Sequence, residues 1–469
     1  MKIVRNWCTG PRPVHSFRKY GRTAGALMLG AAALLAPMPA SAQSAAPTPA
    51  VPAVAPSPVG QSVADFYRAR KDAPLWLAPQ AGDAPQQLIS LLSTANIDGL
   101  NPQKYQPAEL ETLLQAALAK HKRKDVQRAD LALSNAFVAY VEDLHQDPGV
   151  GITYVDPQLR PKPPSPLATL LDAAAAPSLT DYVQNFGWMH PFYGELRKAL
   201  AEHKYSDDDK RQALEVNLER ARALPSGKQR YVLVNAAQQR LFMYEDGKAV
   251  DSMVVVVGQT KWPTPMLTAY IRYAALNPYW YVPPDLAWED VGQWVKKYGF
   301  GYFQRMGYEQ VSDWTRDAQV LDATKIDWDA VKDAKEEVLL RQNPGPENFM
   351  GRIKFMFPNQ FGVYLHDNPR RNLFKESVRY FSGGCVRLED AWRLSRWLFH
   401  RELTWEGHGT EEPVPLEQPV PVYITYLTAV PDGQSIAYYD DAYGRDKAML
   451  AKIDASSGTA TGTIASAKR

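Results

Sequence analysis

The residues best suited to covalent chemistry are Cys385, inside the stretch FSGGCVR at 381–387, and His366, nineteen positions before it. An unperturbed thiol has a pKa of about 8.5, so little of it is ionised at neutral pH and a nucleophilic cysteine has to be activated. His366 can accept the proton of the thiol, and Arg387 supplies a fixed positive charge. The pattern predicts a catalytic cysteine–histidine dyad.

Two glycines, Gly383 and Gly384, directly precede the cysteine. Glycine permits a tight turn and a close approach of substrate, so backbone N–H groups of this turn could converge where a tetrahedral oxyanion develops. Ser382 is expected to stabilise the turn. A helix predicted from Leu388 to about Phe399 would place its positive end close to Cys385.

The imidazole of such a dyad needs a group that orients it. Asp367 is adjacent in the sequence, and either its carboxylate or its backbone carbonyl could hold the ring of His366. Asp390 and Glu389 are weaker candidates and are expected at the helix N-terminus instead.

The first 42 residues have the composition of a secretory signal peptide. Six basic residues precede an uncharged apolar run at 23–36, and the small-residue tripeptide Ala40-Ser41-Ala42 follows it. This order is typical of a signal peptide, and the apolar core is shorter than the ~20 residues that a membrane span needs. An uncleaved anchor is the alternative.

Removal of this segment changes the charge and the cysteine count. It holds six Lys/Arg and no Asp/Glu, so 47 basic (53 minus 6) and 51 acidic residues remain, a net charge of −4. No basic arm for nucleic acid remains, and we expect no nucleic-acid partner. Cys8 leaves with the signal, so Cys385 becomes the only thiol of an exported chain. This favours a chemical use of the thiol; a buried, inert cysteine is the alternative.

The chain after the signal peptide divides by composition and periodicity. Residues 43–60 are an uncharged Ala/Pro-rich linker, and residues 61–205 carry apolar stripes of helical period that predict a helical scaffold domain. Residues 206–229 are expected to form a connecting helix, and the Ala/Ser/Thr/Gly tail at 453–469 is predicted to be disordered.

At Arg230 the apolar period changes from 3.6 to 2, which predicts an antiparallel β domain over 230–452 with His366 at the end of a strand. An aromatic-rich insertion at 277–341 interrupts it and includes Trp280 and Tyr281. So many aromatic side chains suggest a subdomain that covers a substrate groove, and packing in a small core of its own is the alternative.

Two pairs of residues in the helical region were considered as metal ligands. They are Asp143 with His145 and His190 with His203. Their spacings fit no common metal motif, so we expect solvated or helix-capping roles and no metal site.

The cysteine motif, together with YLHD at 364–367, resembles the signature of the L,D-transpeptidases, the YkuD-domain enzymes of the bacterial cell wall, and especially their large YcbB-like branch. The motif with its histidine is specific, whereas the helical matches alone would be weak. Further similarity lies at Phe66-Tyr67, Pro74-Leu75-Trp76, 98–102, 217–220, 231–235, Gly258, Thr264-Pro265, 344–348 and 443–446.

The resemblance implies an α+β protein, in which an N-terminal helical domain precedes a mainly antiparallel YkuD-type β domain with an inserted capping subdomain. It implies that Cys385 attacks a diamino acid carbonyl in a donor peptidoglycan stem, holds a thioester, and passes the acyl group to the amine of a second stem. The catalytic set would be Cys385, His366, Asp367, Arg387 and the Ser382–Gly384 turn. We assign Tyr364, Trp280 and Tyr281 to substrate binding. No cofactor or metal is expected, and carbapenem acylation of Cys385 is implied.

One feature departs from the family pattern. Large relatives carry a peptidoglycan-binding repeat domain, but only about a dozen residues separate Tyr205 from Asn217. Together, the signal peptide and the resemblance imply a periplasmic L,D-transpeptidase that acts in cell-wall biogenesis and cell shape. Its cross-links would be of the 3-3 or the 1-3 type. A thiol hydrolase or exchange enzyme, a lipoprotein-anchoring transpeptidase and a non-catalytic wall-binding protein are alternatives. The sequence leaves the oligomeric state open.

Overall fold

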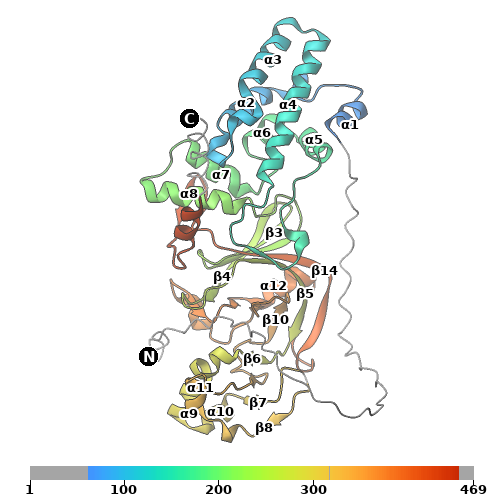
Figure 1. Cartoon of the computed structure of the whole chain (residues 1–469). Helices are drawn as coiled ribbons and strands as arrows, with labels where there is room; N and C mark the ends of the chain where they lie inside the picture. Colours follow the sequence, from blue (N-terminus) through green and yellow to red (C-terminus); the bar gives the residue numbers. More distant parts are fainter. Residues whose placement is uncertain (1–61, 316, 454–469) are drawn as a thin grey trace, which may run out of the picture. The chain divides into compact units, whose positions relative to one another are not determined.

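The computed structural model describes residues 62–315 and 317–453 (Figure 1). The predicted signal peptide (1–42), the linker (43–60) and all but the first residue of the predicted tail (453–469) lie outside the described residues. Within the described ranges, no helix combines the length and the apolar character that a membrane crossing requires.

The N-terminal region is helical, as its periodicity predicts. The first and last of its helices begin at capping residues: Ser62 forms a capping box with Asp65, and the side chain of Asp207 accepts a hydrogen bond from the backbone of Lys210. The helices are α1 Val63–Ala69, α2 Ala84–Ser93, α3 Pro107–Lys120, α4 Arg123–Leu144, α5 Pro166–Ala175, α6 Leu179–Gln184, α7 Pro191–Ala201 and α8 Asp208–Ala221. The helix α8 falls within the predicted connecting helix.

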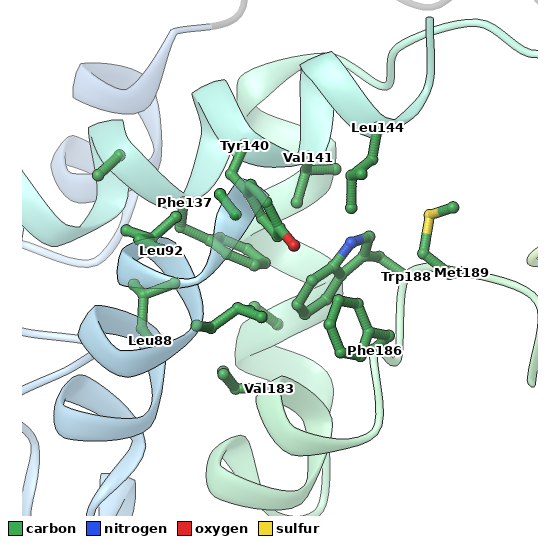
Figure 2. Packing of buried hydrophobic residues seen from close by; sticks show 14 of the residues in the cluster. Leu88, Leu92, Phe137, Tyr140, Val141, Leu144, Val183, Phe186, Trp188 and Met189 are labelled. Atoms are coloured by element: carbon green, nitrogen blue, oxygen red, sulfur yellow. The ribbon is translucent and has the colours of Figure 1, made fainter. Parts of the chain in front are cut away.

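Figure 2 shows the centre of this helical region, where Trp188 packs among side chains of the surrounding helices. The indole contacts the rings of Phe137 and Tyr140 edge-on, with centroids 5.0 and 6.4 Å apart. Leu88 and Leu92 of α2 are fully buried in the same cluster. Burial of each large apolar side chain contributes about 1.5–3 kcal/mol, so this cluster supplies the main drive for folding the region.

The side chains that were considered as metal ligands have other partners. Asp143 accepts hydrogen bonds from Lys104 and Tyr105, and Nδ1 of His203 lies 2.7 Å from the hydroxyl of Tyr205. His190 caps α7 by accepting the backbone N–H of Phe192. Across the described ranges, no group of three or more His, Cys, Asp or Glu residues could hold a metal ion.

Burial of His190, at the start of α7, predicts that the fold loses stability in acid. Burial lowers the pKa of His190 to about 3, whereas the unfolded chain titrates near 6.5. Between these values the unfolded state binds one more proton, so this site reduces stability as the pH falls from 6.5 towards 3. In His190→Asn the cap acceptor is kept and the titration is lost. As the pH decreases, we expect the free energy of unfolding of the variant to fall less steeply than that of the original chain. The difference in slope should be about 1.4 kcal/mol per pH unit.

Urea unfolding at several pH values between 4 and 7 measures this slope for both proteins. Equal slopes in the variant and the original chain would contradict the assignment of the acid sensitivity to His190, whatever the difference in absolute stability.

The β domain is built on a ten-stranded sheet with the order β1-β5-β10-β11-β13-β4-β3-β2-β14 and β12 beside β4. β14, the last strand in this order, is also hydrogen-bonded to β5, the second strand. The strands are β1 Thr153–Tyr154, β2 Tyr231–Asn235, β3 Arg240–Glu245, β4 Lys248–Gly258, β5 Leu267–Leu276, β10 Ile353–Met356, β11 Leu365–His366, β12 Tyr380–Ser382, β13 Val386–Leu388 and β14 Glu412–Thr425. The helical region followed by this β-rich domain confirms the α+β class.

Most neighbouring strands run antiparallel, as predicted, but the sheet is mixed. β11 pairs with β13 in parallel, and so do β14 with β2, β12 with β4 and β1 with β5. The short strand β1, which lies in a segment predicted to be helical, joins the helical region to the sheet.

One face of this sheet packs on helix α12, Ala391–Phe399. Ile353 and Phe355 of β10, Leu365 of β11 and Leu388 of β13 are fully buried with Leu394 of α12 in a single apolar cluster. Because successive strand residues point to opposite faces, the residues between them project from the other face of the sheet. That other face carries the candidate site.

The aromatic-rich insertion has regular structure and a core of its own. Its strands form a separate sheet, β6-β9-β7-β8. The aromatic side chains of Trp280 and Trp328 are buried in its core. The elements are β6 Trp280–Val282, a π-helix Ala287–Gly292, α9 Gln293–Tyr298, α10 Phe300–Arg305, β7 Tyr308–Val311, β8 Val320–Leu321, α11 Trp328–Lys332 and β9 Leu340–Gln342. Packing therefore explains part of the aromatic content.

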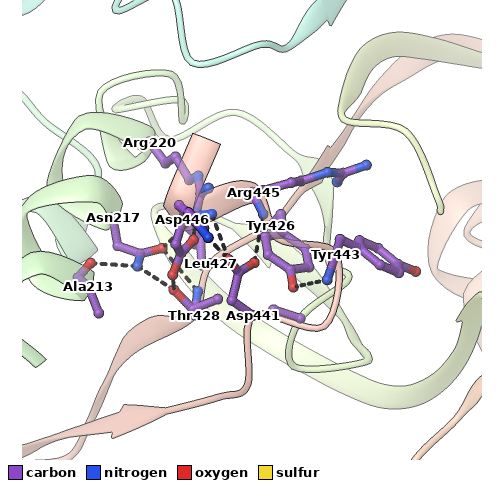
Figure 3. Close-up of polar contacts among 12 residues, drawn as sticks. Ala213, Asn217, Arg220, Tyr426, Leu427, Thr428, Asp441, Tyr443, Arg445 and Asp446 are labelled. Carbon is purple, nitrogen blue, oxygen red and sulfur yellow. Dashed lines mark hydrogen bonds and ion pairs between the residues drawn. The ribbon is translucent and has the colours of Figure 1, made fainter. Parts of the chain in front are cut away.

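The segment after β14 ties the two regions together. A hairpin that was not predicted, β15 Ala429–Asp432 with β16 Ser435–Tyr438, contributes Ala429 to the helical core. Figure 3 shows the polar contacts beside it: Arg220 of α8 forms an ion pair with Asp446, and Asn217 bonds to Thr428. The Arg220 side chain is 2% exposed, so this ion pair is buried.

Candidate active site

Three neighbouring strands bring three ionisable side chains into one row. His366 on β11 is the direct partner of Lys354 on β10 and of Arg387 on β13. Directly paired residues project from the same face of a sheet, so all three lie on the face opposite α12. The residues next in the row, Ala275 and Val256, also lie outside the apolar cluster under that helix.

Cys385 lies directly before β13, two residues before Arg387. Val386 and Arg387 pair with Leu365 and His366, so the start of β13 lies beside β11, the strand that ends at His366. The thiol is half-buried, and its Sγ lies 3.7 Å from the carbonyl oxygen of Gly362. The two residues predicted as a dyad are thus brought together by strand register.

The imidazole of His366 is oriented by the neighbouring backbone. Its Nδ1 lies 2.6 Å from the carbonyl oxygen of Asp367. A carbonyl only accepts, so Nδ1 carries the hydrogen in the neutral ring and Nε2 is the basic atom. Among the described residues Nε2 is buried without a hydrogen bond of ordinary geometry, and the backbone of Met350 also lies near the ring. Nε2 is therefore available to accept a proton.

Of the two groups of Asp367 that could orient the ring, the structure selects the carbonyl. The carboxylate accepts hydrogen bonds from the backbone N–H of Arg352, at 3.0 Å, and from Nη2 of Arg371, at 2.7 Å. Asp390 caps α12 through the N–H of Arg393, as expected for a residue at a helix N-terminus.

The turn before the cysteine is held by Ser382. Its hydroxyl donates to the carbonyl of Cys385 at 2.5 Å and accepts from the N–H of Gly384 at 3.1 Å. Gly384 has a φ of +118°, a conformation that other residues rarely adopt. The stabilising role of Ser382 is confirmed. The N–H of Gly384 is thus engaged within the turn, and the convergence of N–H groups on an oxyanion stays a prediction.

The predicted helix at the thiol is the clearest correction. Val386–Leu388 form strand β13, and α12 begins only at Ala391. The positive end of a helix acts within about its first turn, so it does not reach Cys385. Side-chain cations have to take its place.

The electrostatics favour a neutral resting pair. Burial raises the pKa of the Cys385 thiol, and the nearby charges of Arg387 and Lys354 act in the opposite direction. Burial, followed by the charge of Arg387, lowers the pKa of His366 to about 3. At neutral pH the thiol is protonated and the imidazole is uncharged. The pair can therefore act by general-base transfer of the thiol proton during attack.

Arg387 itself is in a crowded position. Burial lowers its pKa to about 10, and its Nε is buried without a hydrogen-bond partner in the described part of the chain. The insertion places Asp290 near it, and burial raises the pKa of that carboxyl to about 6 although Arg387 opposes the shift.

Behind the turn lies a chain of buried hydrogen bonds centred on Thr264. Its hydroxyl accepts from the N–H of Gly258 at 2.8 Å and donates to the carbonyl of Gly384 at 2.9 Å. Tyr443 and Arg445, both drawn in Figure 3, donate to the carbonyls of Gly258 and Thr264 at 2.6 and 2.8 Å. The C-terminal segment thus supports the turn that carries the thiol.

Substitution of Thr264 by Val, which has nearly the same shape, removes the hydroxyl from this chain. The N–H of Gly258 and the carbonyl of Gly384 would both lose a buried partner, at about 1–3 kcal/mol for each group. We expect lower stability and slower alkylation of Cys385, and Thr264→Ser should retain both properties. Denaturant unfolding and iodoacetamide kinetics measure them. Full stability in the Val variant would contradict this role.

The residues assigned to substrate binding lie in different surroundings. Tyr364 precedes β11, and burial raises its pKa to about 12. The hydroxyl of Tyr281 donates to Glu411 at 3.0 Å. Trp280 is only 8% exposed and packs on Phe349 with ring centroids 4.8 Å apart, so it belongs to the core of the insertion, and its part in substrate binding stays a prediction.

The sequence reasoning missed Lys354, Thr264 and Asp290 at this site. Lys354 did leave a signal, because a lysine between the apolar residues Ile353 and Phe355 marks the solvent or site face of a strand. Asp290 left none, since its position depends on the fold of the insertion.

Comparison with known proteins identifies the domain. The structure has a β-rich domain with His366 on β11 and Cys385 directly before β13. The model of the L,D-transpeptidase catalytic domain, YkuD, matches residues 229–422, and a scaffold-domain model matches residues 61–200. Residues 229–422 are thus an L,D-transpeptidase catalytic domain of the YkuD family.

A full-length relative supports this assignment. The chain is 26% identical over 404 residues to a Haemophilus influenzae protein named "Putative L,D-transpeptidase", a match that covers 84% of this chain and 80% of the relative.

Two solved structures are more distant. They are an Ldtfm-avibactam carbamoyl enzyme, at 12% identity over 43% of this chain, and an L,D-transpeptidase from Mycobacterium smegmatis, at 14% over 42%. Both have a TM-score of 0.20, and the chain spans 51% and 58% of their lengths.

Proposed function

We propose that this protein is an exported L,D-transpeptidase that cross-links peptidoglycan stems through a thioester on Cys385. The observation that carries the proposal is the placement of His366 on β11 and of Cys385 directly before β13, the strand paired with β11, inside the YkuD domain. The basic Nε2 of His366 is buried without a hydrogen bond of ordinary geometry in the described chain, so it can serve the thiol or a substrate amine.

In the first half-reaction, the thiol attacks the carbonyl of the diamino acid in the donor stem. Nε2 of His366 takes the thiol proton as the C–S bond forms. The C–N bond to the terminal D-amino acid then breaks, and the imidazolium returns the proton to the leaving amine. Arg387 favours the negative charge that develops beside it.

In the second half-reaction, an amine of an acceptor stem attacks the thioester. His366 takes a proton from that amine, the C–S bond breaks, and Cys385 is regenerated as a thiol. Acceptor amines on the diamino acid give 3-3 links, and an acceptor at the first position gives 1-3 links. The thiol that forms the thioester is also the group that carbapenems would acylate.

The insertion is proposed to cap the donor and acceptor stems. It approaches the turn of the nucleophile closely, since a Cβ placed on Gly383 would lie 2.9 Å from Leu286. An ion pair of 2.8 Å between Lys261 and Glu289 joins the β4–β5 loop to the insertion. These contacts, one just before the π-helix and one within it, support a role for the insertion in holding the stems next to Cys385.

The test is incubation of the purified protein with disaccharide-tetrapeptide, followed by mass spectrometry of the products. Cross-linked dimer with released D-amino acid supports the proposal, and fragmentation distinguishes 3-3 from 1-3 links. Disaccharide-tripeptide alone would indicate a hydrolase, and transfer to a free D-amino acid would indicate exchange. Unchanged substrate that remains bound to the protein would indicate a wall-binding protein instead.

The periplasmic location is also a proposal, based on the composition of residues 1–42. Fusion of this segment to a reporter enzyme that is active only outside the cytoplasm tests it. An inactive reporter would contradict export.

A further inference from the structure

We infer that Lys354 is a positioning cation of the active site, held by Glu411 so that its charge stabilises the Cys385 thiolate. The inference deepens the proposed function, and it concerns a residue that the cysteine motif does not include.

The position of Lys354 follows from register. It is the direct cross-strand partner of His366 and projects from the same face of the sheet. Its ammonium lies 5.5 Å from the ring centre of Tyr364, the residue two positions before His366. Lys354 therefore borders the dyad on the side opposite Arg387.

A built set of contacts fixes the ammonium there. Nζ of Lys354 lies 2.6 Å from Oε1 of Glu411, and the two side chains are only 7% and 18% exposed. The hydroxyl of Tyr281, in the insertion, donates to the other oxygen of the same carboxylate at 3.0 Å. The backbone N–H of Glu411 donates to the carbonyl of Asn277. The carboxylate is thus anchored from the insertion.

Stability alone gives a poor reason for this pair. Two charges that are nearly buried lose most of their hydration, and well-packed apolar residues at such positions are often as stable or more so. The strand β10 is otherwise apolar at Ile353 and Phe355, on its other face. A buried lysine near this thiol would stabilise the thiolate that forms when the thiol loses its proton.

The thiolate needs this charge because no helix end supplies it. Four side chains of the described residues face Cys385. They are Tyr364, which precedes β11, His366 on β11, Arg387 on β13 and Lys354 on β10. His366 is uncharged at neutral pH, and Asp290 faces Arg387 and opposes part of its charge. Lys354 is thus the second cation that can offset the burial of the thiol.

The same charge has a second effect on the dyad. Lys354 and Arg387 both lower the pKa of His366, which keeps its Nε2 free of a proton. One cation pair therefore favours both the thiolate and the neutral base. Glu411 sets how strongly Lys354 acts, since it competes with the thiolate for the ammonium.

The test measures the rate of iodoacetamide alkylation of Cys385 against pH in the full chain, in four proteins. The midpoint of the profile gives the apparent pKa of the thiol. Lys354→Met should raise it by about one unit, and Glu411→Gln should lower it because the ammonium loses its competitor. The double variant should lie between the original chain and Lys354→Met, since it lacks both the cation and the unpaired carboxylate.

This ordering separates the inference from a structural role. A purely structural pair would give shifts of one direction, or none, in all three variants, and that result would overturn the inference. If Lys354→Met does not fold, the comparison of Glu411→Gln with the double variant still decides, because these two proteins differ only in the ammonium and equal midpoints would overturn the inference. Alkylation requires no peptidoglycan, so failure of the cross-linking assay would overturn the proposed function and leave this measurement intact.

Discussion

Replacement of Cys385 by Ser is expected to abolish cross-linking while the fold persists. The hydroxyl of serine has a much higher pKa than a thiol, and the site offers a neutral imidazole and two cations rather than a strong base. The thioester cannot form, so we expect the rate to fall by at least ~10³-fold. Mass spectrometry of the disaccharide-tetrapeptide products measures the loss.

The matched control is the stability of the variant. The Cys385 side chain is half-buried, and its described polar contact is a weak one of 3.7 Å to Gly362. The free energy of unfolding should therefore change by less than about 1 kcal/mol. Cross-linking that survives in Cys385→Ser would show that another group is the nucleophile.

The second large effect is expected on stability, at the ion pair between α8 and the C-terminal segment (Figure 3). Asp446→Ala leaves Arg220, which is 2% exposed, without its counter-charge and removes a hydrogen bond from Thr428. Loss of one partner of a buried pair costs about 3–5 kcal/mol. Urea unfolding should show this loss.

A double variant provides the control for the unpaired charge. In Arg220→Met with Asp446→Ala, no charge is left buried, so most of the lost stability should return. A double variant that is less stable than Asp446→Ala would contradict this explanation and point to packing of Arg220 on Tyr426, whose ring centre lies 5.5 Å away, as the main contribution.

The sequence predicted the dyad because strand periodicity and a short spacing are local properties. His366 ends an alternating run, and Cys385 follows nineteen residues later, so the two needed only adjacent strands to meet. The α+β class followed from the change of period at Arg230 for the same reason.

The start of helix α12 was predicted too early because strand β13 is set by distant partners. Val386–Leu388 pair with β11 on one side and with β4 on the other, and these pairings lie far away in the sequence. A three-residue strand next to an amphipathic helix carries no pattern that separates it from the first turn of that helix.

The supporting residues could not be predicted for a related reason. Glu411 is 57 residues from Lys354, and Thr264 is 120 residues from Gly384. Each contact depends on how the sheet brings distant strands together. In the aromatic insertion, composition alone did not separate binding from packing. Its aromatic residues suggested a binding surface, whereas Trp280 packs in the core of the insertion.

The thioester on Cys385 is the central claim, and intact-protein mass spectrometry tests it directly. The full chain would be mixed with disaccharide-tetrapeptide, quenched in acid within seconds, and digested to locate any adduct. We predict a mass increase equal to the donor minus its terminal D-amino acid, on the peptide that contains Cys385. Product formation with no adduct on that peptide, or with an adduct on another residue, would contradict the account.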